Sequence, residues 1–496
     1  MNNIAVIFAF DLSSYAFKQA INNEDSFSRT VAFARGLPDI SETLILANPG
    51  FECPEGCRLL AKESWTAEDL ILTLRENCPS GGNVFFMRGD CPLLNMDIAN
   101  RMYTDHCGFL AQYTFADGYP AGLAPEIINH EILDALQVLS AGDLAKVDRN
   151  TIYRIIEKDI NAFDLETEIA PKDLRLYRVS LTADNKRNFM VLEAFIKEGA
   201  VEEGPIISAV TDKQELLRSI PAYFPIQIVG GCPQKCSFCP YPQINPGLLN
   251  DTSIMSADDF QIILDKIFSL AEDAIINLSL WGEPSLHPQI DQLVSKILNF
   301  PQFSLVMETS GIGWREDAFN KILALDNDRI SWIVSLEASG PPAYAKLRGP
   351  GFEEAHAFVE KLLAAAPEKT YIQAVRMMEN EEDLERFYRK WKDRTENLII
   401  QKYDHFSGFL PERKVADLSP LVRMPCWHIK RDFCILLNGD SPMCREDLKN
   451  EYSLGNIFKD DIVKIWNKGQ EMYKSHISGK YPGICGKCDE YYTYNF

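Results

Sequence analysis

The chain has 496 residues, 46% of them hydrophobic, which exceeds what one hydrophobic core supports and predicts two to four domains. Its 50 basic and 71 acidic residues give a net charge of −21, which disfavours nucleic acid as a partner because the surface repels phosphate backbones. No stretch is long and apolar enough to span a membrane, so we expect no membrane partner and a cytoplasmic protein.

Residues 1–205 alternate strand and helix patterns and are predicted to form a doubly wound α/β layer. Within this layer, residues 84–87 form a buried strand that delivers Asp90 to its end, where a carboxylate can bind Mg²⁺ and a nucleotide. The segment 198–211 shifts in composition and contains Glu202-Glu203-Gly204-Pro205. We expect it to link the N-terminal unit to the rest of the chain.

The run Arg88-Gly89-Asp90-Cys91-Pro92-Leu93 resembles the G-D-x-P-L element of sugar cytidylyltransferases and related nucleotidyltransferases. That resemblance implies that Asp90 and Asp184 bind a metal ion. The first loop departs from the family, since it lacks the expected glycine and arginine and carries Asp11, with Lys18 as the cation nearby. Cradling a triphosphate needs flexible backbone and cationic side chains. The unit is therefore expected to be a degenerate nucleotidyltransferase-like domain that binds a nucleotide-sugar or a partner without nucleotidyl transfer.

From Pro225 onward, strands and helices alternate regularly, which predicts a parallel sheet with helical crossovers. Six units are too few to close an eight-fold barrel, so residues 222–405 are predicted to form an open, partial (β/α)6 barrel. Its chemistry is expected in the loops at the carboxyl ends of the strands. The predicted strands are 225–229, 275–280, 304–308, 330–336, 371–377 and 398–403. One predicted helix starts at Ser256, and the others cover 289–298, 316–325, 353–365 and 381–391.

The first barrel strand leads directly into a loop with Cys232, Cys236 and Cys239. Three thiolates can hold three irons of a [4Fe–4S] cluster and leave the fourth iron open. A zinc site is the alternative, but a structural zinc normally takes four ligands. An open iron can chelate the amino and carboxylate groups of S-adenosylmethionine (SAM).

This loop resembles the signature of the radical SAM superfamily, C-x3-C-x-aromatic-C, and Phe238 occupies the aromatic position that lies near the adenine. The resemblance implies SAM as cofactor. It also implies SAM contacts from Gly282, Glu283 and Pro284, which resemble the superfamily's G-G-E-P element although Trp281 replaces its first glycine. Ser310 after the third strand and Ser335 and Glu337 after the fourth match further SAM-binding positions, with Glu337 in place of the usual aspartate.

Residues 418–496 lose the alternation and are predicted to form a small metal-braced module. Cys485 and Cys488 form a C-x-x-C pair, and a hairpin could bring Cys426 and Cys444 beside it, for either zinc or a second [4Fe–4S] cluster. The spacing resembles a short SPASM domain, which implies one auxiliary [4Fe–4S] cluster. The chain as a whole resembles the spiro-SPASM proteins of spirochaetes.

These features predict an oxidoreductase of the radical SAM type that cleaves SAM and abstracts hydrogen from a substrate, with electrons from a donor such as flavodoxin or ferredoxin. The SPASM resemblance favours a peptide or protein substrate, whereas the N-terminal unit favours a sugar-type one. Two other functions stay open at this point. The chain could be a sugar nucleotidyltransferase with a regulatory iron–sulfur module, or a metal-braced scaffold without activity.

Overall fold

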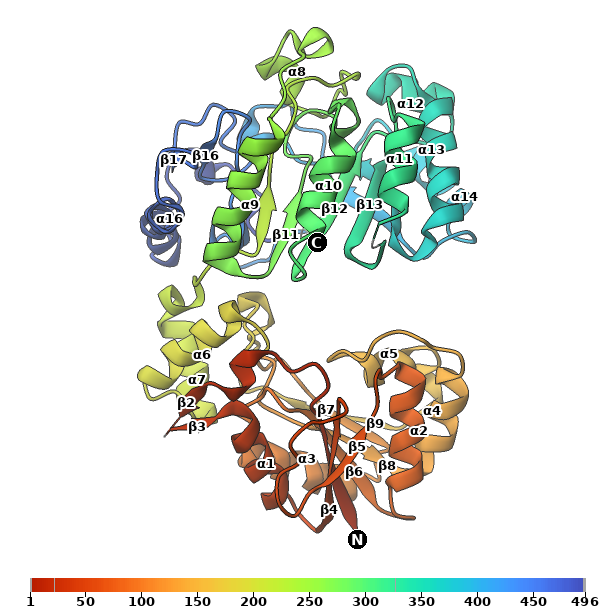
Figure 1. Cartoon of the computed structure of the whole chain (residues 1–496), viewed down its shortest axis with the longest axis vertical. Helices are drawn as coiled ribbons and strands as arrows, with labels where there is room; N and C mark the ends of the chain where they lie inside the picture. Colours follow the sequence, from red (N-terminus) through yellow and green to blue (C-terminus); the bar gives the residue numbers. More distant parts are fainter. Residues whose placement is uncertain (1, 22, 326, 494–496) are drawn as a thin grey trace. The chain divides into compact units, whose positions relative to one another are not determined.

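The computed structural model describes residues 2–21, 23–325 and 327–493, and the chain divides into two units, Met1–Ser219 and Ile220–Phe496 (Figure 1). Each unit has its own sheet and hydrophobic core. None of the helices in the described residues has the length and apolar character needed to cross a membrane.

The N-terminal unit is built on a seven-stranded mixed sheet with the strand order β5-β4-β1-β6-β8-β7-β9. β8 runs antiparallel to β6 and β7, and the other neighbouring strands are parallel. The strands are β1 (Asn3–Phe8), β4 (Ile40–Ala47), β5 (Arg58–Ala61), β6 (Asn83–Arg88), β7 (Tyr113–Asp117), β8 (Glu126–Asn129) and β9 (Leu165–Ile169), and a hairpin joins β2 (Gln19–Ile21) to β3 (Glu24–Asp25).

Helices cover both faces of this sheet. Every residue of β1 is accordingly buried, although successive side chains of a strand point to opposite sides. Ala5 and Ile7 belong to one core, whereas Ile4, Val6 and Phe8 belong to the other. The first core includes α1 (Ser26–Gly36), α3 (Met96–Gly108), α6 (Lys186–Lys197) and α7 (Glu203–Asp212), and the second includes α2 (Ala67–Asn77), α4 (Leu133–Ser140) and α5 (Thr151–Glu157).

The segment 198–211 is not the linker that its composition predicts. Most of it forms α7, and Ile206, Ala209 and Val210 of that helix are buried in the core of the N-terminal unit. Their spacing of three and four residues places them on one helical face. The prediction of a linker was based on the glutamates and the Gly-Pro pair at the start of the helix, and it did not take this short apolar stripe into account.

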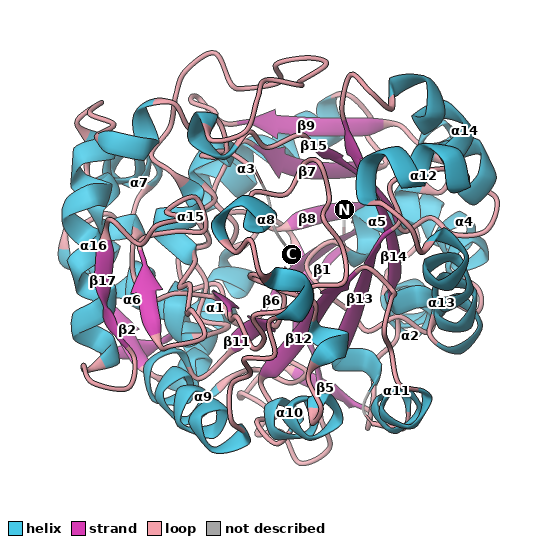
Figure 2. Cartoon of the chain, turned by 90° about the horizontal axis from the view of Figure 1, so that it is seen from above, coloured by secondary structure: helices cyan, strands magenta, loops and turns pink. Residues whose placement is uncertain are grey.

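The second unit begins with a six-stranded parallel sheet in sequential order, β10 to β15, as the alternating pattern predicts. The strands are β10 (Tyr223–Pro225), β11 (Ala274–Asn277), β12 (Phe303–Thr309), β13 (Ile330–Ser335), β14 (Thr370–Arg376) and β15 (Leu398–Lys402). In Figure 2, helices α9 (Ala257–Ala271), α10 (Ile290–Leu298), α11 (Glu316–Leu323) and α13 (Phe352–Ala365) form an arc outside the strands β11 to β14. α14 (Glu381–Trp391) continues this outer layer, and its Phe387 and Trp391 are fully buried in the core.

Two short helices of this unit lie outside the predicted elements. α8 (Tyr241–Ile244) follows the cysteine loop, and α12 (Pro341–Arg348) follows β13. Pro341 occupies the first position of α12, where a missing N–H breaks no helical hydrogen bond. The pair Pro341-Pro342 is therefore a signal for the start of this helix.

The C-terminal module packs onto the first edge of the barrel sheet. The backbone N–H groups of Phe433 and Ile435 donate to the carbonyl oxygens of Tyr223 and Pro225, at 2.9 Å in both cases. Trp466 also joins the barrel core. The module consists of α15 (Trp427–Arg431), the antiparallel pair β16 (Asp440–Pro442) and β17 (Ser453–Asn456), and α16 (Ile462–Ile477).

Candidate functional site

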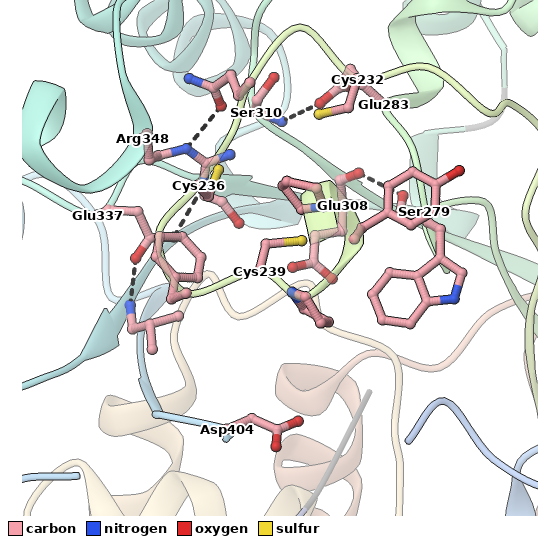
Figure 3. A pocket seen from close by; sticks show the side chains of 18 of the residues that line it. Cys232, Cys236, Cys239, Ser279, Glu283, Glu308, Ser310, Glu337, Arg348 and Asp404 are labelled. Atoms are coloured by element: carbon pink, nitrogen blue, oxygen red, sulfur yellow. Dashed lines mark hydrogen bonds and ion pairs between the residues drawn. The ribbon is translucent and has the colours of Figure 1, made fainter. Parts of the chain in front are cut away.

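The loop after β10 places Cys232, Cys236 and Cys239 around one cavity, together with the Phe238 ring (Figure 3). The loop is fixed by its own backbone, because the Cys232 N–H donates to the Leu248 carbonyl and the Cys239 N–H to that of Cys236. The described residues that line this cavity include no fourth cysteine and no histidine. The site therefore offers three soft ligands and leaves one metal coordination position to another molecule.

Burial raises the pKa of the Cys232 thiol to about 12 and raises those of Cys236 and Cys239 as well. Neutral thiols in an apolar loop are inert, whereas a bound cation favours the thiolate form that ligates iron. The donor set fits a [4Fe–4S] cluster with one open iron.

Glu283 lies beside this loop, with its side chain 3% exposed. Its carboxylate accepts hydrogen bonds from the Thr309 hydroxyl at 2.5 Å and the Ser310 N–H at 2.8 Å. Both donors are neutral, so these contacts supply no positive charge to offset that of a carboxylate, and burial raises the pKa of Glu283. A buried carboxylate held by neutral donors favours a cationic partner in the cavity.

Gly282 brings this carboxylate close to the cysteine loop. Its φ is +81°, and a Cβ atom there would lie 2.4 Å from the Val229 carbonyl oxygen. The Glu283 N–H then donates to the Gly231 carbonyl at 2.8 Å. Because no other residue fits this position, the glycine fixes where the glutamate enters the cavity.

A second buried carboxylate, Glu337, faces the other side of the cavity and is completely inaccessible to solvent. It accepts hydrogen bonds from Arg348 Nη1 at 3.1 Å and from the Val375 N–H at 2.6 Å. Arg348 also donates from Nε to Gln234 at 2.9 Å and lies 5.7 Å from the centroid of the Phe238 ring. This network fixes the orientation of the predicted adenine-contacting ring, and Arg348 and Gln234 were not among the predicted site residues.

The other predicted residues also line this cavity, except Pro284, which is buried directly behind Glu283 in a short 3-10 helix. Ser335 accepts a hydrogen bond from Gln373 Nε2 at 3.2 Å, and the same amide donates to Glu308. The structure thus brings together the predicted residues Cys232, Cys236, Phe238, Cys239, Gly282, Glu283, Ser310, Ser335 and Glu337.

Charged residues from β15 and from the C-terminal module complete the cavity wall. Lys402 is the last residue of β15, and Asp404 follows that strand. Arg445, which comes directly after Cys444, donates to Asp404 at 2.7 Å. Sequence reasoning missed all three. The position of Lys402 and Asp404 at a strand's carboxyl end was an available signal, whereas that of Arg445 depends on the docking of the C-terminal module.

The four predicted C-terminal ligands Cys426, Cys444, Cys485 and Cys488 line a second, more enclosed cavity. Cys434 is buried outside it. Among the residues that the structure describes, one group of three potential ligands has its donor atoms within 4.8 Å of one another, and it is Asp404, Asp489 and Glu490.

In the N-terminal unit, Asp90 and Asp184 come close enough to share one partner, the guanidinium of Arg149. Arg149 Nη2 lies 2.8 Å from Asp90 and 3.5 Å from Asp184. In the first loop, the Asp11 N–H donates to the Asn48 side chain, and Lys18 Nζ lies 3.5 Å from the centroid of the Tyr15 ring.

Comparison with known proteins gives matches in both halves of the second unit. The family model described as the radical SAM superfamily matches residues 226–390, and the SPASM model, described as an iron–sulfur cluster-binding domain, matches residues 426–489. A Treponema pallidum (strain Nichols) protein described as uncharacterized is 38% identical over 358 residues, covering 70% of this chain and 98% of its own length.

Solved structures with a similar fold include Streptococcus suis SuiB bound to the precursor peptide SuiA, with 15% identity and a TM-score of 0.44 over 65% of this chain and 87% of that one. BtrN in complex with AdoMet and 2-DOIA has 17% identity and a TM-score of 0.39, covering 54% and 92% of the two chains. The corresponding values for anSMEcpe with bound AdoMet are 13% identity, a TM-score of 0.41, and 52% and 81% coverage.

Proposed function

The chain belongs to the radical SAM superfamily, and from this premise we propose that Cys232, Cys236 and Cys239 hold its SAM-binding [4Fe–4S] cluster. The observation that carries the proposal is the pairing of these three thiols with the buried Glu283 in one cavity. When bound, the cluster supplies an electron to the SAM sulfonium, which gives methionine and a 5′-deoxyadenosyl radical that abstracts hydrogen from the substrate.

The residues around the thiols would bind and orient SAM. The carboxylate of Glu283 would accept a hydrogen bond from the SAM amino group, and the Phe238 ring would contact the adenine. Ser310, Ser335 and Glu337 would offer polar partners to the rest of SAM. Arg348 keeps Phe238 and Glu337 in position through the contacts described above. Exclusion of water by these walls protects a reactive intermediate from side reactions.

For the C-terminal cavity we propose a single auxiliary [4Fe–4S] cluster on Cys426, Cys444, Cys485 and Cys488. Support comes from the four thiols in one enclosed cavity and from the match of the iron–sulfur SPASM model to residues 426–489. Electrons would arrive from a small carrier such as flavodoxin or ferredoxin.

The substrate is proposed to be a polar molecule, either a peptide or a sugar-type compound. Glu308, Gln373, Lys402, Asp404 and Arg445 line the cavity on the side of the last strands and the C-terminal module. Such groups can hydrogen-bond backbone amides or hydroxyl groups.

The test is anaerobic incubation of the reconstituted, reduced protein with SAM, followed by quantification of 5′-deoxyadenosine and methionine. We expect slow cleavage without substrate and faster cleavage when a fraction of cell extract supplies it. Absence of 5′-deoxyadenosine from a protein that holds its full iron content would contradict the proposal.

A further inference from the structure

The N-terminal unit contains a cavity of about 520 Å³ beside the strands β6, β7 and β8. Its size falls within the range of about 300–1,000 Å³ found for small-molecule sites. Three arginines, Arg88, Arg149 and Arg175, line it together with the rings of Tyr113, Phe115 and Tyr153. Cationic donors at one part of a cavity and flat rings at another suit a ligand with two chemically different ends.

Arg149 stands where a metal ion bound by Asp90 and Asp184 would lie. Its Nη2 contacts both carboxylates, and its Nη1 donates to the Cys91 sulfur at 3.3 Å. Asp90 is 1% exposed, so its charge must be compensated inside the protein. The guanidinium supplies that compensation permanently, and the aspartates are no longer available as a pair for Mg²⁺. The residues therefore do not fit the metal that the sequence resemblance implies.

The same guanidinium remains able to bind a ligand from the cavity. It carries five N–H groups, more than its contacts with Asp90, Asp184 and Cys91 require. Arg149 is thus a fixed cation at the cavity wall, oriented in advance by the buried Asp90 and the partly exposed Asp184.

Arg88 adds a donor that the protein itself leaves unsatisfied. Its Nε atom is buried without a hydrogen bond, and the nearest acidic oxygen, Asp90 Oδ2, lies 3.7 Å away. The guanidinium packs on the Phe8 ring, with 5.4 Å to the centroid. The side chain as a whole is 17% exposed and lines the cavity, so an oxygen of a bound anion can accept from its other N–H groups.

The aromatic part of the cavity is a wall of neighbouring rings. Tyr113 and Phe115 are stacked with their centroids 5.6 Å apart, and Phe115 contacts Tyr153 at 5.4 Å. Glu126 also lines this part, and burial raises its pKa to about 8, so at neutral pH its carboxyl group carries little negative charge. Asp117 also lines the cavity, but its carboxylate is paired with Arg175 at 3.1 Å. A flat ring can therefore lie against this wall without meeting an unpaired anion.

We propose that this cavity binds, without a divalent metal, a small organic oxyanion that carries a flat ring, with the anion at Arg88 and Arg149. The anionic group of this ligand is a phosphate or a carboxylate, since both present oxygens that accept hydrogen bonds from arginine. This site is separate from the cysteine cavity, and its ligand is bound rather than transferred by a metal-dependent reaction.

The first experiment measures binding to the full-length holoprotein by calorimetry in the presence of EDTA. The probes are CMP and UMP for the phosphate arm, 4-hydroxybenzoate for the carboxylate arm, and inorganic phosphate and cytidine as half-ligands. None contains the adenine of SAM, so they do not compete for the other cavity. We expect at least one ring-bearing probe to bind, with the same affinity when Mg²⁺ replaces EDTA. Binding by none of them, or binding that requires Mg²⁺, would overturn the proposal.

Two variants locate the site. Arg88→Gln keeps the size of the side chain but removes the charge, and we expect it to weaken binding at least tenfold. The matched control is Arg154→Gln, because Arg154 pairs with Asp148 at 2.9 Å and does not line the cavity. Equal affinity of Arg88→Gln and the control would place the ligand elsewhere.

A third variant tests the role of Arg149 by a gain of function. In Arg149→Ala, Asp90 and Asp184 lose their shared cation, and we expect the holoprotein to bind one additional Mn²⁺, detected by loss of the free Mn²⁺ signal in electron paramagnetic resonance. If the wild-type protein already binds this Mn²⁺ and Asp184→Asn loses it, the acids form a metal site despite the guanidinium. That result would refute the proposal. If Arg149→Ala does not fold, the Mn²⁺ comparison of wild type with Asp184→Asn still decides the question.

Discussion

Each unit of the protein buries a carboxylate at the carboxyl end of a parallel strand, but the two carboxylates have opposite partners. Glu283 accepts from the Thr309 hydroxyl and the Ser310 N–H, which are neutral, whereas Asp90 is paired with the guanidinium of Arg149. A buried anion with neutral donors still attracts a cation, and one with its own arginine does not. A buried acid therefore indicates a site for a cation only when no cationic side chain of the protein already compensates the charge of that acid.

The largest expected effect comes from removing the thiols beside Glu283. We predict that changing Cys232, Cys236 and Cys239 together to Ala abolishes 5′-deoxyadenosine formation and removes half of about eight irons, because two four-iron clusters are expected. The measurement is iron analysis and product quantification after anaerobic reconstitution. Cys485→Ala with Cys488→Ala is the matched control, which should lose the other half of the iron but keep SAM binding. An unchanged iron content in the triple variant would place the first cluster elsewhere.

The second effect concerns the ion pair that supports the SAM cavity. Arg348→Met leaves Glu337 buried without its cation, and we expect the free energy of unfolding to fall by about 3–5 kcal/mol. The measurement is the urea midpoint of unfolding followed by tryptophan fluorescence under anaerobic conditions. Arg389→Met breaks an exposed pair with Glu385 and should change stability by only about 0.3–0.5 kcal/mol. Similar losses in both variants would show that the buried pair is no more important than a surface pair.

How far the sequence predicts these features depends on whether their residues are contiguous. The cysteine loop and Gly282-Glu283-Pro284 each lie within a few residues directly after a strand, so a local pattern was enough to place them at one cavity. Five of the six barrel strands were also predicted within a few residues, because the apolar runs of a parallel sheet are local signals, whereas β10 (Tyr223–Pro225) shares only Pro225 with its predicted range 225–229.

Residues that meet only through tertiary contacts were not predictable in this way. Arg445 reaches Asp404 because the C-terminal module docks on the barrel edge, and Arg149 reaches Asp90 from the start of another helix. Nothing in the spacing of these residues reveals the contact. The same limitation explains why Asp90 and Asp184 were expected to bind a metal, since a matching pair of acids in the sequence does not show which cation lies between them.

The third prediction tests the uncompensated charge directly. Glu283→Gln preserves the size of the side chain but removes its charge, and SAM affinity should fall about 10- to 150-fold, since a charge-assisted hydrogen bond contributes about 1.5–3 kcal/mol. Equilibrium binding of SAM to the reconstituted protein measures the change. Glu316→Gln, at a side chain that is 77% exposed, serves as control. The same affinity in both variants would exclude Glu283 from the SAM site.

The smallest expected effect is in the N-terminal unit, where we predict that the full-length protein releases no pyrophosphate from CTP or other nucleoside triphosphates with Mg²⁺ present. Two features argue against the reaction. The acids that would hold the metal are paired with Arg149, and the first loop presents Asp11 where the triphosphate needs cations. Lys18, the nearby cation of that loop, lies over the Tyr15 ring. A carboxylate near several phosphate charges is repulsive, and more strongly so where the local dielectric constant is low. Asp90→Asn should therefore leave the background unchanged in a coupled pyrophosphate assay. Metal-dependent release that Asp90→Asn abolishes would show that Arg149 can move aside for a metal ion. Asp90 would then be able to bind a cation from solution, as we infer for Glu283, and its pairing with Arg149 would not exclude a metal.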